Sequence, residues 1–150
     1  RLADGSTISQ PAMVAVVLEE LRLTPGLRVL EIGSGSGYLL ALMASMGVEA
    51  TGIEIDERLA AESQARLGEI AEVIAGDGAM AKGNPPYARI VVSAALLYAV
   101  PEWALTQLSG DGFVLAPIGT GHVQELVRAW SDGRRERTGR LCRFVPFRRN

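Results

Sequence analysis

The stretch that decides the fold is VLEIGSGSGY, residues 29–38, in which an apolar run leads into three alternating glycines. Glycine is needed where the backbone turns tightly and approaches a ligand closely, because a Cβ atom would clash there and a positive φ is costly for other residues. A strand, a glycine loop and a helix in this order are typical of proteins that bind a nucleotide-like cofactor. We therefore expect an enzyme domain.

The spacing of the glycines distinguishes this loop from two other nucleotide sites. A dinucleotide fingerprint, G-x-G-x-x-G, would need its third glycine where Tyr38 stands. A phosphate-binding P-loop would end in Gly-Lys followed by Ser or Thr, and the single lysine, Lys82, lies far from the loop. The loop reads G-x-G-x-G, so a nucleoside triphosphate is not the expected ligand.

An acidic residue ends the second strand-like run. Glu54 closes residues 50–54, about 20 residues beyond the first glycine, where an acid that binds ribose is expected. A carboxylate at this place accepts hydrogen bonds from both ribose hydroxyls. Alternatively, Glu54 belongs with Asp56 and Glu57 to the acidic start of the next helix, where acids favour the positive end of the helix dipole.

Length and composition indicate one domain over residues 1–150, since 48% of the 150 residues are hydrophobic, enough for a sizeable core. The apolar runs are too short to span a membrane and no charged-then-apolar leader is visible, so we expect a cytoplasmic protein with no membrane partner. Cys142 is the only cysteine. Its apolar setting indicates a buried thiol, and we predict no metal site.

The charge pattern limits the partners. A formal net charge of -2 gives no general attraction to nucleic acid, so no nucleic-acid partner is expected. Arginines nevertheless gather late in the sequence, at Arg128, Arg134, Arg135, Arg137, Arg140, Arg143, Arg148 and Arg149. They either lie in solvent on a hairpin or form a patch for an acidic peptide. The sequence leaves the oligomeric state open.

Alternating helix and strand patterns predict a parallel sheet covered by helices. The expected helices are residues 10–22, 37–46, 57–67 and 102–108, and the expected strands are residues 28–32, 50–54, 72–75, 90–92 and 112–118. Two further strands, residues 123–130 and 140–147 joined by the polar loop 131–139, would end the sheet in an antiparallel hairpin. The predicted fold is α/β and doubly wound, with a mostly parallel, Rossmann-like sheet.

Four motifs occur along the chain in the order found in one enzyme family. They are GSTISQP at residues 5–11, LEIGSGSGY at 30–38, GDG at 76–78 and FVP at 144–146. The first resembles the G-x-T-I-S-x-P signature of the protein-L-isoaspartate O-methyltransferases, and the four together cover most of the chain. The resemblance implies a class I methyltransferase fold, S-adenosylmethionine as cofactor, and methylation of the α-carboxylate of L-isoaspartyl residues in damaged proteins or peptides.

The resemblance also implies roles for individual residues. Ser9 matches the active-site serine of the family, and Val145 and Pro146 match the late segment that walls the substrate pocket. The cofactor-binding residues would be Ser6, Thr7, Glu31, Gly33, Ser34, Gly35, Gly37, Glu54, Ile55, Asp77 and Gly78. Among these, residues 33–35 would lie beside the methionine part and Asp77 near the adenine, while Ser6 and Thr7 would close over the cofactor.

Two of these roles have structural alternatives. Ser9 precedes a helix with Pro11 in its first turn, so it could act only as an N-cap, worth roughly 1 kcal/mol. Asp77 between two glycines could be a turn residue. Methyl transfer to a carboxylate needs no general base, because a carboxyl group with a pKa near 4 is already ionised. The absence of a His, Cys or paired-acid constellation therefore suits catalysis by positioning.

Three features favour other interpretations. Asn84-Pro85-Pro86-Tyr87 has the form of the N-P-P-Y motif of methyltransferases that modify amide or adenine nitrogens, but there the motif follows the fourth strand, whereas here it precedes residues 90–92. Ala88 stands where the family usually has an acid. The family usually also has a helical segment before its T-I-S motif, and this sequence starts almost on that motif, so we expect a trimmed or excised domain.

The function hypotheses that remain fall into three classes. The first is isoaspartyl repair, and a related one is a carboxyl methyltransferase for one specific peptide aspartate. The second is a non-catalytic core that only binds S-adenosylmethionine. The third, a nicotinamide-dependent oxidoreductase, is disfavoured by Tyr38 and by the lack of a proton donor beside a hydride site.

Overall fold

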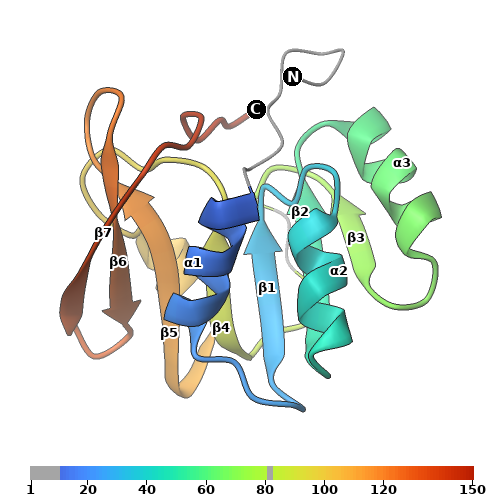
Figure 1. Cartoon of the computed structure of the whole chain (residues 1–150), viewed down its shortest axis with the longest axis horizontal. Coiled ribbons are helices and arrows are strands. Elements are labelled where there is room, and N and C mark those ends of the chain that lie inside the picture. Colours follow the sequence, from blue (N-terminus) through green and yellow to red (C-terminus); the bar gives the residue numbers. More distant parts are fainter. Residues whose placement is uncertain (1–10, 81–82) are drawn as a thin grey trace.

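The computed structural model describes residues 11–80 and 83–150 (Figure 1). In chain order the elements are α1 (Pro11–Leu21), β1 (Arg28–Ile32), α2 (Tyr38–Ser45), β2 (Glu49–Glu54), α3 (Glu57–Leu67), β3 (Glu72–Ala75), β4 (Tyr87–Val92), α4 (Glu102–Leu105), β5 (Leu108–Ile118), β6 (Gln124–Trp130) and β7 (Arg135–Cys142). The strands form one seven-stranded sheet in the order β3-β2-β1-β4-β5-β6-β7.

The sheet is parallel from β3 through β5, and β6 and β7 add an antiparallel hairpin. The chain first runs outward from β1 to β3 and then returns to place β4 on the other side of β1. The carboxyl ends of β1, β2 and β4 therefore meet at one edge, where the strand order reverses. In open α/β sheets this switch point is where ligands bind. The predicted fold class is confirmed.

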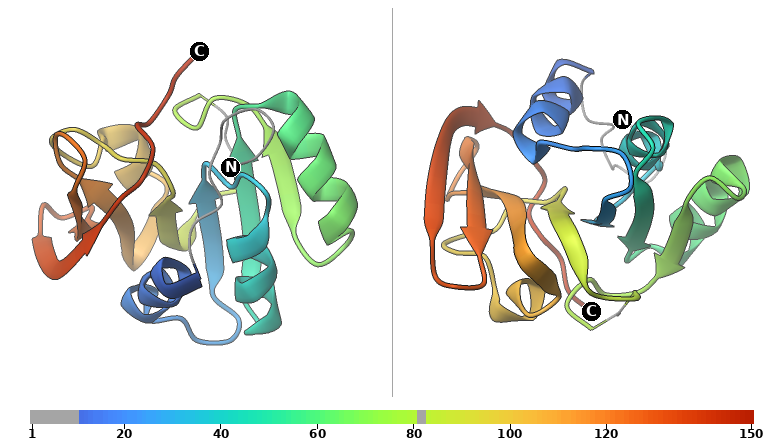
Figure 2. Two further views of the ribbon diagram at one scale, coloured as in Figure 1. Left: turned by 45° about the horizontal axis from the view of Figure 1, so that its top comes forward. Right: turned by 90° about the horizontal axis from the view of Figure 1, so that it is seen from below.

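Alternate residues of the central strands face two separate cores, as a period of two requires. Val29 and Val91 pack on the face that carries α1 and α2, and Leu30 and Ile90 pack on the face that carries α4. Figure 2 shows these helices on opposite sides of the sheet. Because both faces are covered, the strands read as nearly continuous apolar runs.

Most predicted elements are confirmed to within a few residues, and β1, α3 and β3 have the predicted bounds. The last strand was predicted wrongly. Residues 135–142 form β7, although residues 131–139 were expected to be a loop. β7 is an edge strand whose charged residues are mostly exposed, and residues 135–140 include no apolar side chain. The apolar pattern therefore favoured residues 140–147 as the strand.

The apolar residues after β7 have another place. The segment 144–147 leaves the sheet edge and runs back toward α1 (Figure 1), where Pro146 bridges to Ala95 beyond the end of β4. Phe144 packs against the core under α1, and Phe147 packs against the core under α4. The predicted helix 102–108 is likewise shorter, because β5 already begins at Leu108.

The prediction of a buried thiol is confirmed. Cys142 is only 4% exposed, and burial, with a smaller contribution from the charge of Glu125, raises the pKa of its thiol to about 11. The thiolate fraction near neutral pH is therefore very small, which suits a packing role. Within the described residues, no helix is long and apolar enough to cross a membrane.

Gly52 in β2 is expected to be intolerant of a side chain. A Cβ atom there would lie 2.6 Å from Leu40 Cδ1 and 2.7 Å from Ser34 Oγ, so Gly52→Ala should push α2 and the glycine loop away from the sheet. We expect a loss of about 1–3 kcal/mol in the free energy of unfolding, measured by urea denaturation.

Gly110→Ala is the matched control, because Gly110 is an exposed β5 residue with no atom within 4 Å of the added Cβ. It should change the free energy of unfolding by no more than about 0.5 kcal/mol. Equal stabilities of the two variants would contradict the close packing at Gly52.

Candidate active site

The glycine loop joins β1 to α2 in left-handed backbone conformations. Gly33, Gly35 and Gly37 have φ values of 82°, 54° and 83°, a region that costs other residues energy. The N–H groups of Gly33 and Ser34 donate to the carbonyl of Ile53 at 2.8 and 3.2 Å. The loop is therefore anchored to the carboxyl end of β2.

Glu54, the last residue of β2, holds the glycine loop through its side chain. One carboxylate oxygen accepts the N–H of Gly35 at 2.7 Å, and the other accepts the N–H of Asp56 at 3.0 Å. Asp56 in turn caps α3, since its carboxylate accepts the N–H of Leu59 at 2.9 Å. Glu54 therefore does more than place a negative charge near the start of α3, which was the alternative interpretation. Each of its two oxygens accepts one of these bonds and keeps a second lone pair for a further donor.

Glu31 of β1 contributes a second buried carboxyl group. It is 3% exposed, and the hydroxyl of Ser93, just after β4, donates to its Oε2 atom at 2.6 Å. Its Oε1 atom has no hydrogen-bond partner among the described residues, and neither has Ser34 Oγ. Burial, aided by the nearby charge of Glu54 and opposed by the Ser93 hydrogen bond, raises the pKa of Glu31 to about 8.

These residues line one pocket at the carboxyl ends of β1, β2 and β4. Its lower wall is the glycine loop and the two acids, and α1 contributes Met13, Val14 and Val17. The segment 144–148 closes a further side, held by hydrogen bonds from Ala95 N–H to Val145 O at 2.7 Å and from Phe147 N–H to Ala95 O at 2.9 Å. The pocket is thus assembled from segments more than 130 residues apart in the sequence.

Nine of the residues assigned from the sequence line this pocket. They are Glu31, Gly33, Ser34, Gly35, Glu54, Ile55, Gly78, Val145 and Pro146. The predictions for Ser6, Thr7 and Ser9 fall outside the described residues. In the part of the chain that the structure describes, no group of three or more His, Cys, Asp and Glu residues is placed to hold a metal ion.

Gly37 and Asp77 do not line the pocket. Gly37 is the N-cap of α2, and a Cβ atom there would lie 2.9 Å from Leu67 Cδ1, so it serves close packing with α3. The Asp77 carboxylate accepts the N–H of Ala79 at 2.9 Å and the N–H of Asn150 at 3.0 Å. The Ala79 bond is the main cause of its lowered pKa. That bond fits the turn interpretation of Asp77, whereas the Asn150 bond is a long-range contact.

The N-P-P-Y motif lies at the opposite edge of the sheet from the pocket. The register pairs Val29 with Arg89 and Ile32 with Val92, so residues 84–86 precede β4 at the amino end of β1, and Tyr87 is the first residue of β4. The Tyr87 ring is 1% exposed in the core, and its hydroxyl accepts the N–H of Asn84 at 2.7 Å. From this position the motif cannot contact a methyl-accepting nitrogen bound in the pocket.

Comparison with known proteins decides the family. The family model of protein-L-isoaspartate(D-aspartate) O-methyltransferase (PCMT) matches residues 1–150. The chain belongs to this family. Protein-L-isoaspartate O-methyltransferase 2 of Rhodopseudomonas palustris is 41% identical over 153 residues, which cover 97% of this chain and 70% of that protein. The protein-L-isoaspartate O-methyltransferase of Roseiflexus castenholzii is 42% identical over 155 residues, with the same coverage.

Solved structures agree with the family at the level of the fold. A Plasmodium falciparum protein described as a protein-L-isoaspartate O-methyltransferase, in complex with S-adenosyl-L-homocysteine, has a TM-score of 0.86 and 24% identity. The match covers all of this chain and 79% of that one. A second protein-L-isoaspartate O-methyltransferase has a TM-score of 0.79 and 30% identity over 94% of this chain and 48% of that one.

Ser93 and helix α1 are two of the pocket contributors to which the sequence analysis assigned no site role. Ser93 was not singled out, although a small polar residue directly after a buried strand at the switch point is a recognisable signal. The α1 residues Met13, Val14 and Val17 belong to the predicted helix 10–22. Periodicity shows that the apolar face of a helix is buried but not what it faces.

The buried Glu31 should make the stability of the protein depend on pH. It keeps its proton up to about pH 8 when folded, against an ordinary pKa of 4.5. Between these values the folded state binds more protons than the unfolded state, so the free energy of unfolding falls as pH rises, by at most about 1.4 kcal/mol per pH unit. The stabilisation that Glu31 contributes is therefore fully present below about pH 4.5 and is lost above about pH 8.

We expect Glu31→Gln to remove this fall, because its amide does not ionise. The measurement is urea denaturation without cofactor between about pH 5 and pH 8.5. Glu57→Gln, at an exposed position in the first turn of α3, is the control and should keep the fall. A pH profile of Glu31→Gln that matches the wild type would refute the assignment.

Proposed function

We propose that this chain uses S-adenosylmethionine to methylate the α-carboxylate of L-isoaspartyl residues in damaged proteins and peptides, the repair reaction of its family. The observation that carries the proposal is the pocket, which joins a glycine loop and two carboxyl groups to the wall at residues 144–147. The relatives named protein-L-isoaspartate O-methyltransferase support the substrate class.

The residues of the pocket suit S-adenosylmethionine. Buried polar atoms are almost always hydrogen-bonded. Glu31 Oε1 and Ser34 Oγ have no partner in the part of the chain that the structure describes, so they favour a ligand that brings hydrogen-bonding groups. The Glu54 carboxylate in the wall of the pocket also favours a cationic ligand. We propose that Glu54 binds the ribose hydroxyls, that residues 33–35 lie along the methionine part, and that Ile55 and Gly78 complete the site.

The chemistry asks for positioning rather than for a base. S-adenosylmethionine supplies, when bound, a methyl group on a positively charged sulfur. An isoaspartyl carboxylate is already ionised near neutral pH, so the task of this chain is to hold the carboxylate in line with the methyl group. In the proposal Val145 and Pro146 wall the acceptor side, and a hydrogen bond from Ser9 orients the carboxylate.

Other parts of the proposal extend beyond the pocket. Residues 1–150 would act as one domain, Ser6 and Thr7 would close over the cofactor, and Asp77 would contact the adenine. The partners would be isoaspartyl proteins and peptides met in the cytoplasm, without nucleic acid. These remain predictions from the sequence.

The first experiment measures transfer of labelled methyl from S-adenosylmethionine to two peptides that differ only in isoaspartate or aspartate at one position. We expect transfer to the isoaspartyl peptide alone. Equal transfer to both peptides would replace the proposal with a carboxyl methyltransferase of another specificity. Cofactor binding by calorimetry without transfer to either peptide would leave only a non-catalytic binding core.

Ser9→Ala separates the two interpretations of this residue. If Ser9 orients the acceptor, kcat for the isoaspartyl peptide should fall about tenfold or more, because the hydrogen bond to a charged group is worth about 1.5–3 kcal/mol. Cofactor affinity should stay within about twofold of the wild type, since Ser9 is assigned to the acceptor side.

Thermal unfolding of Ser9→Ala serves as the comparison. An N-cap alone would give a loss of about 1 kcal/mol in stability with an unchanged kcat. This result would exclude the catalytic assignment of Ser9.

A further inference from the structure

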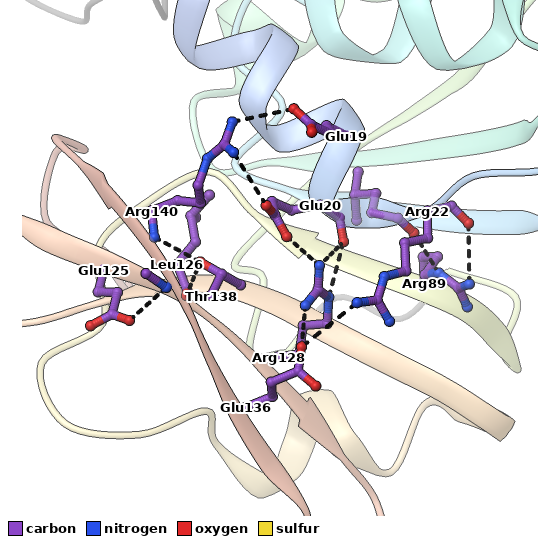
Figure 3. Close-up of polar contacts among 12 residues, drawn as sticks. Glu19, Glu20, Arg22, Arg89, Glu125, Leu126, Arg128, Glu136, Thr138 and Arg140 are labelled. Carbon is purple, nitrogen blue, oxygen red and sulfur yellow. Dashed lines mark hydrogen bonds and ion pairs between the residues drawn. The ribbon is translucent and has the colours of Figure 1, made fainter.

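The C-terminal end of α1 is bound by two arginines from the sheet (Figure 3). The last carbonyl groups of any helix lack partners within the helix. Arg128 of β6 donates from Nε and Nη2 to the carbonyl of Glu20, at 3.1 and 2.9 Å. Arg89 of β4 donates from Nε to the carbonyl of Leu21 at 2.7 Å and from Nη2 to that of Arg22 at 3.3 Å. Three successive carbonyls are thus held.

Arg128 is the central member of this group. It is 2% exposed, and its guanidinium pairs with the carboxylates of Glu20 on α1 and of Glu136 on β7. A buried cation is tolerated only when it is paired and hydrogen-bonded, and here both partners are present. One side chain therefore ties α1 to two strands of the antiparallel hairpin.

Both arginines also contact one aromatic ring. The guanidinium of Arg89 lies 4.2 Å from the centre of the Phe113 ring, and that of Arg128 lies 5.5 Å from it. Burial, followed by the neighbouring cations Arg22 and Arg128, lowers the pKa of Arg89. The two arginines, the Phe113 ring and the two carboxylates form what we name the helix clamp, consisting of Glu20, Arg89, Phe113, Arg128 and Glu136.

The other end of the same helix lines the pocket. Met13, Val14 and Val17 contribute to its wall, and α1 leads back in sequence to the T-I-S motif. The helix has 11 residues, about 16 Å at 1.5 Å per residue. A tilt about the clamped end therefore moves the pocket end by the largest distance.

We propose that Arg128, through the helix clamp, is a positioning residue for methyl transfer, holding α1 so that its first turns form the acceptor side of the pocket. The inference rests on the proposed function. The clamp lies at the end of α1 away from the pocket, so it acts through α1. A buried ion pair is weak evidence for stability, because replacing the whole pair by apolar groups of similar volume is often neutral, although removing one partner alone is strongly destabilising. In this proposal the clamp specifies one position of the helix.

The test compares Arg128→Met with Arg140→Met. Both arginines pair with a Glu20 carboxylate oxygen, but Arg140 is partly exposed and its other contact with α1 is the Glu19 side chain, at 3.2 Å. Methionine keeps the unbranched apolar stem of arginine without its charge. We expect kcat/KM for the isoaspartyl peptide to fall about 10-fold to 100-fold in Arg128→Met, the size expected for a small misplacement of reacting groups.

Two further measurements distinguish a positioning role of Arg128 from a purely structural one. Calorimetric affinity for S-adenosylhomocysteine should fall by a smaller factor than kcat/KM does, because the glycine loop and both acids lie on other elements, while only Ser6 and Thr7 of the residues assigned to the cofactor precede α1 directly. Amide hydrogen exchange of residues 14–21 should become about tenfold faster in Arg128→Met, while exchange in β1 and β4 stays as in the wild type. In Arg140→Met all three quantities should remain close to the wild-type values.

Several outcomes would overturn the inference. One is an equal kcat/KM for Arg128→Met and Arg140→Met when activity is expressed per molecule that binds cofactor. Another is amide hydrogen exchange in α1 of Arg128→Met that is unchanged from the wild type. If Arg128→Met does not fold, Arg128→Lys replaces it. Lysine keeps the charge but cannot bridge as many acceptors. The fall in kcat/KM and the faster exchange of α1 should then appear with smaller magnitude. A wild-type chain that transfers no methyl group would refute the proposed function, and the clamp would then be judged by α1 exchange alone.

Discussion

The Glu54 carboxylate bonds to the N–H of Gly35 at 2.7 Å and to the N–H of Asp56 at 3.0 Å, so it joins the loop after β1 to the loop after β2. Both loops begin at the carboxyl ends of adjacent parallel strands, which brings them within reach of one side chain. The left-handed glycines let the first loop approach this close. The geometry of the pocket depends on this arrangement, because its remaining walls are arranged around the two loops.

The other walls come from distant parts of the chain and are attached by different physical means. Glu31 is linked to the end of β4 by a hydrogen bond with Ser93. The segment 144–147 is held by backbone hydrogen bonds to Ala95. The helix α1 packs its apolar face on the sheet and is clamped at its far end by Arg89 and Arg128. A polar floor and a helix wall that is held at its far end suit a reaction whose main demand is alignment.

Local sequence patterns predicted the parts of the fold that depend on local rules. The glycine loop, β1, α3 and β3 follow from strand and helix periods and from turn residues. The hairpin was placed wrongly because β7 is polar and exposed while the strand-like residues 144–147 pack elsewhere. The Glu31–Ser93 bond spans 62 positions and the Arg128–Glu20 bonds span 108, so no pattern within one element could reveal them. The role of Asp77 was left between two interpretations, and its contacts combine a turn bond to Ala79 with a long-range bond to Asn150.

The segment 144–147 touches both hydrophobic cores, with Phe144 against one and Phe147 stacked on Trp103 at 5.7 Å in the other. It is translated long after the glycine loop and both carboxyl groups, which lie within residues 31–54. Domains generally fold as units. A nascent chain therefore carries the loop and both acids well before the segment that touches both cores, and the pocket can be completed only after that segment has been synthesised.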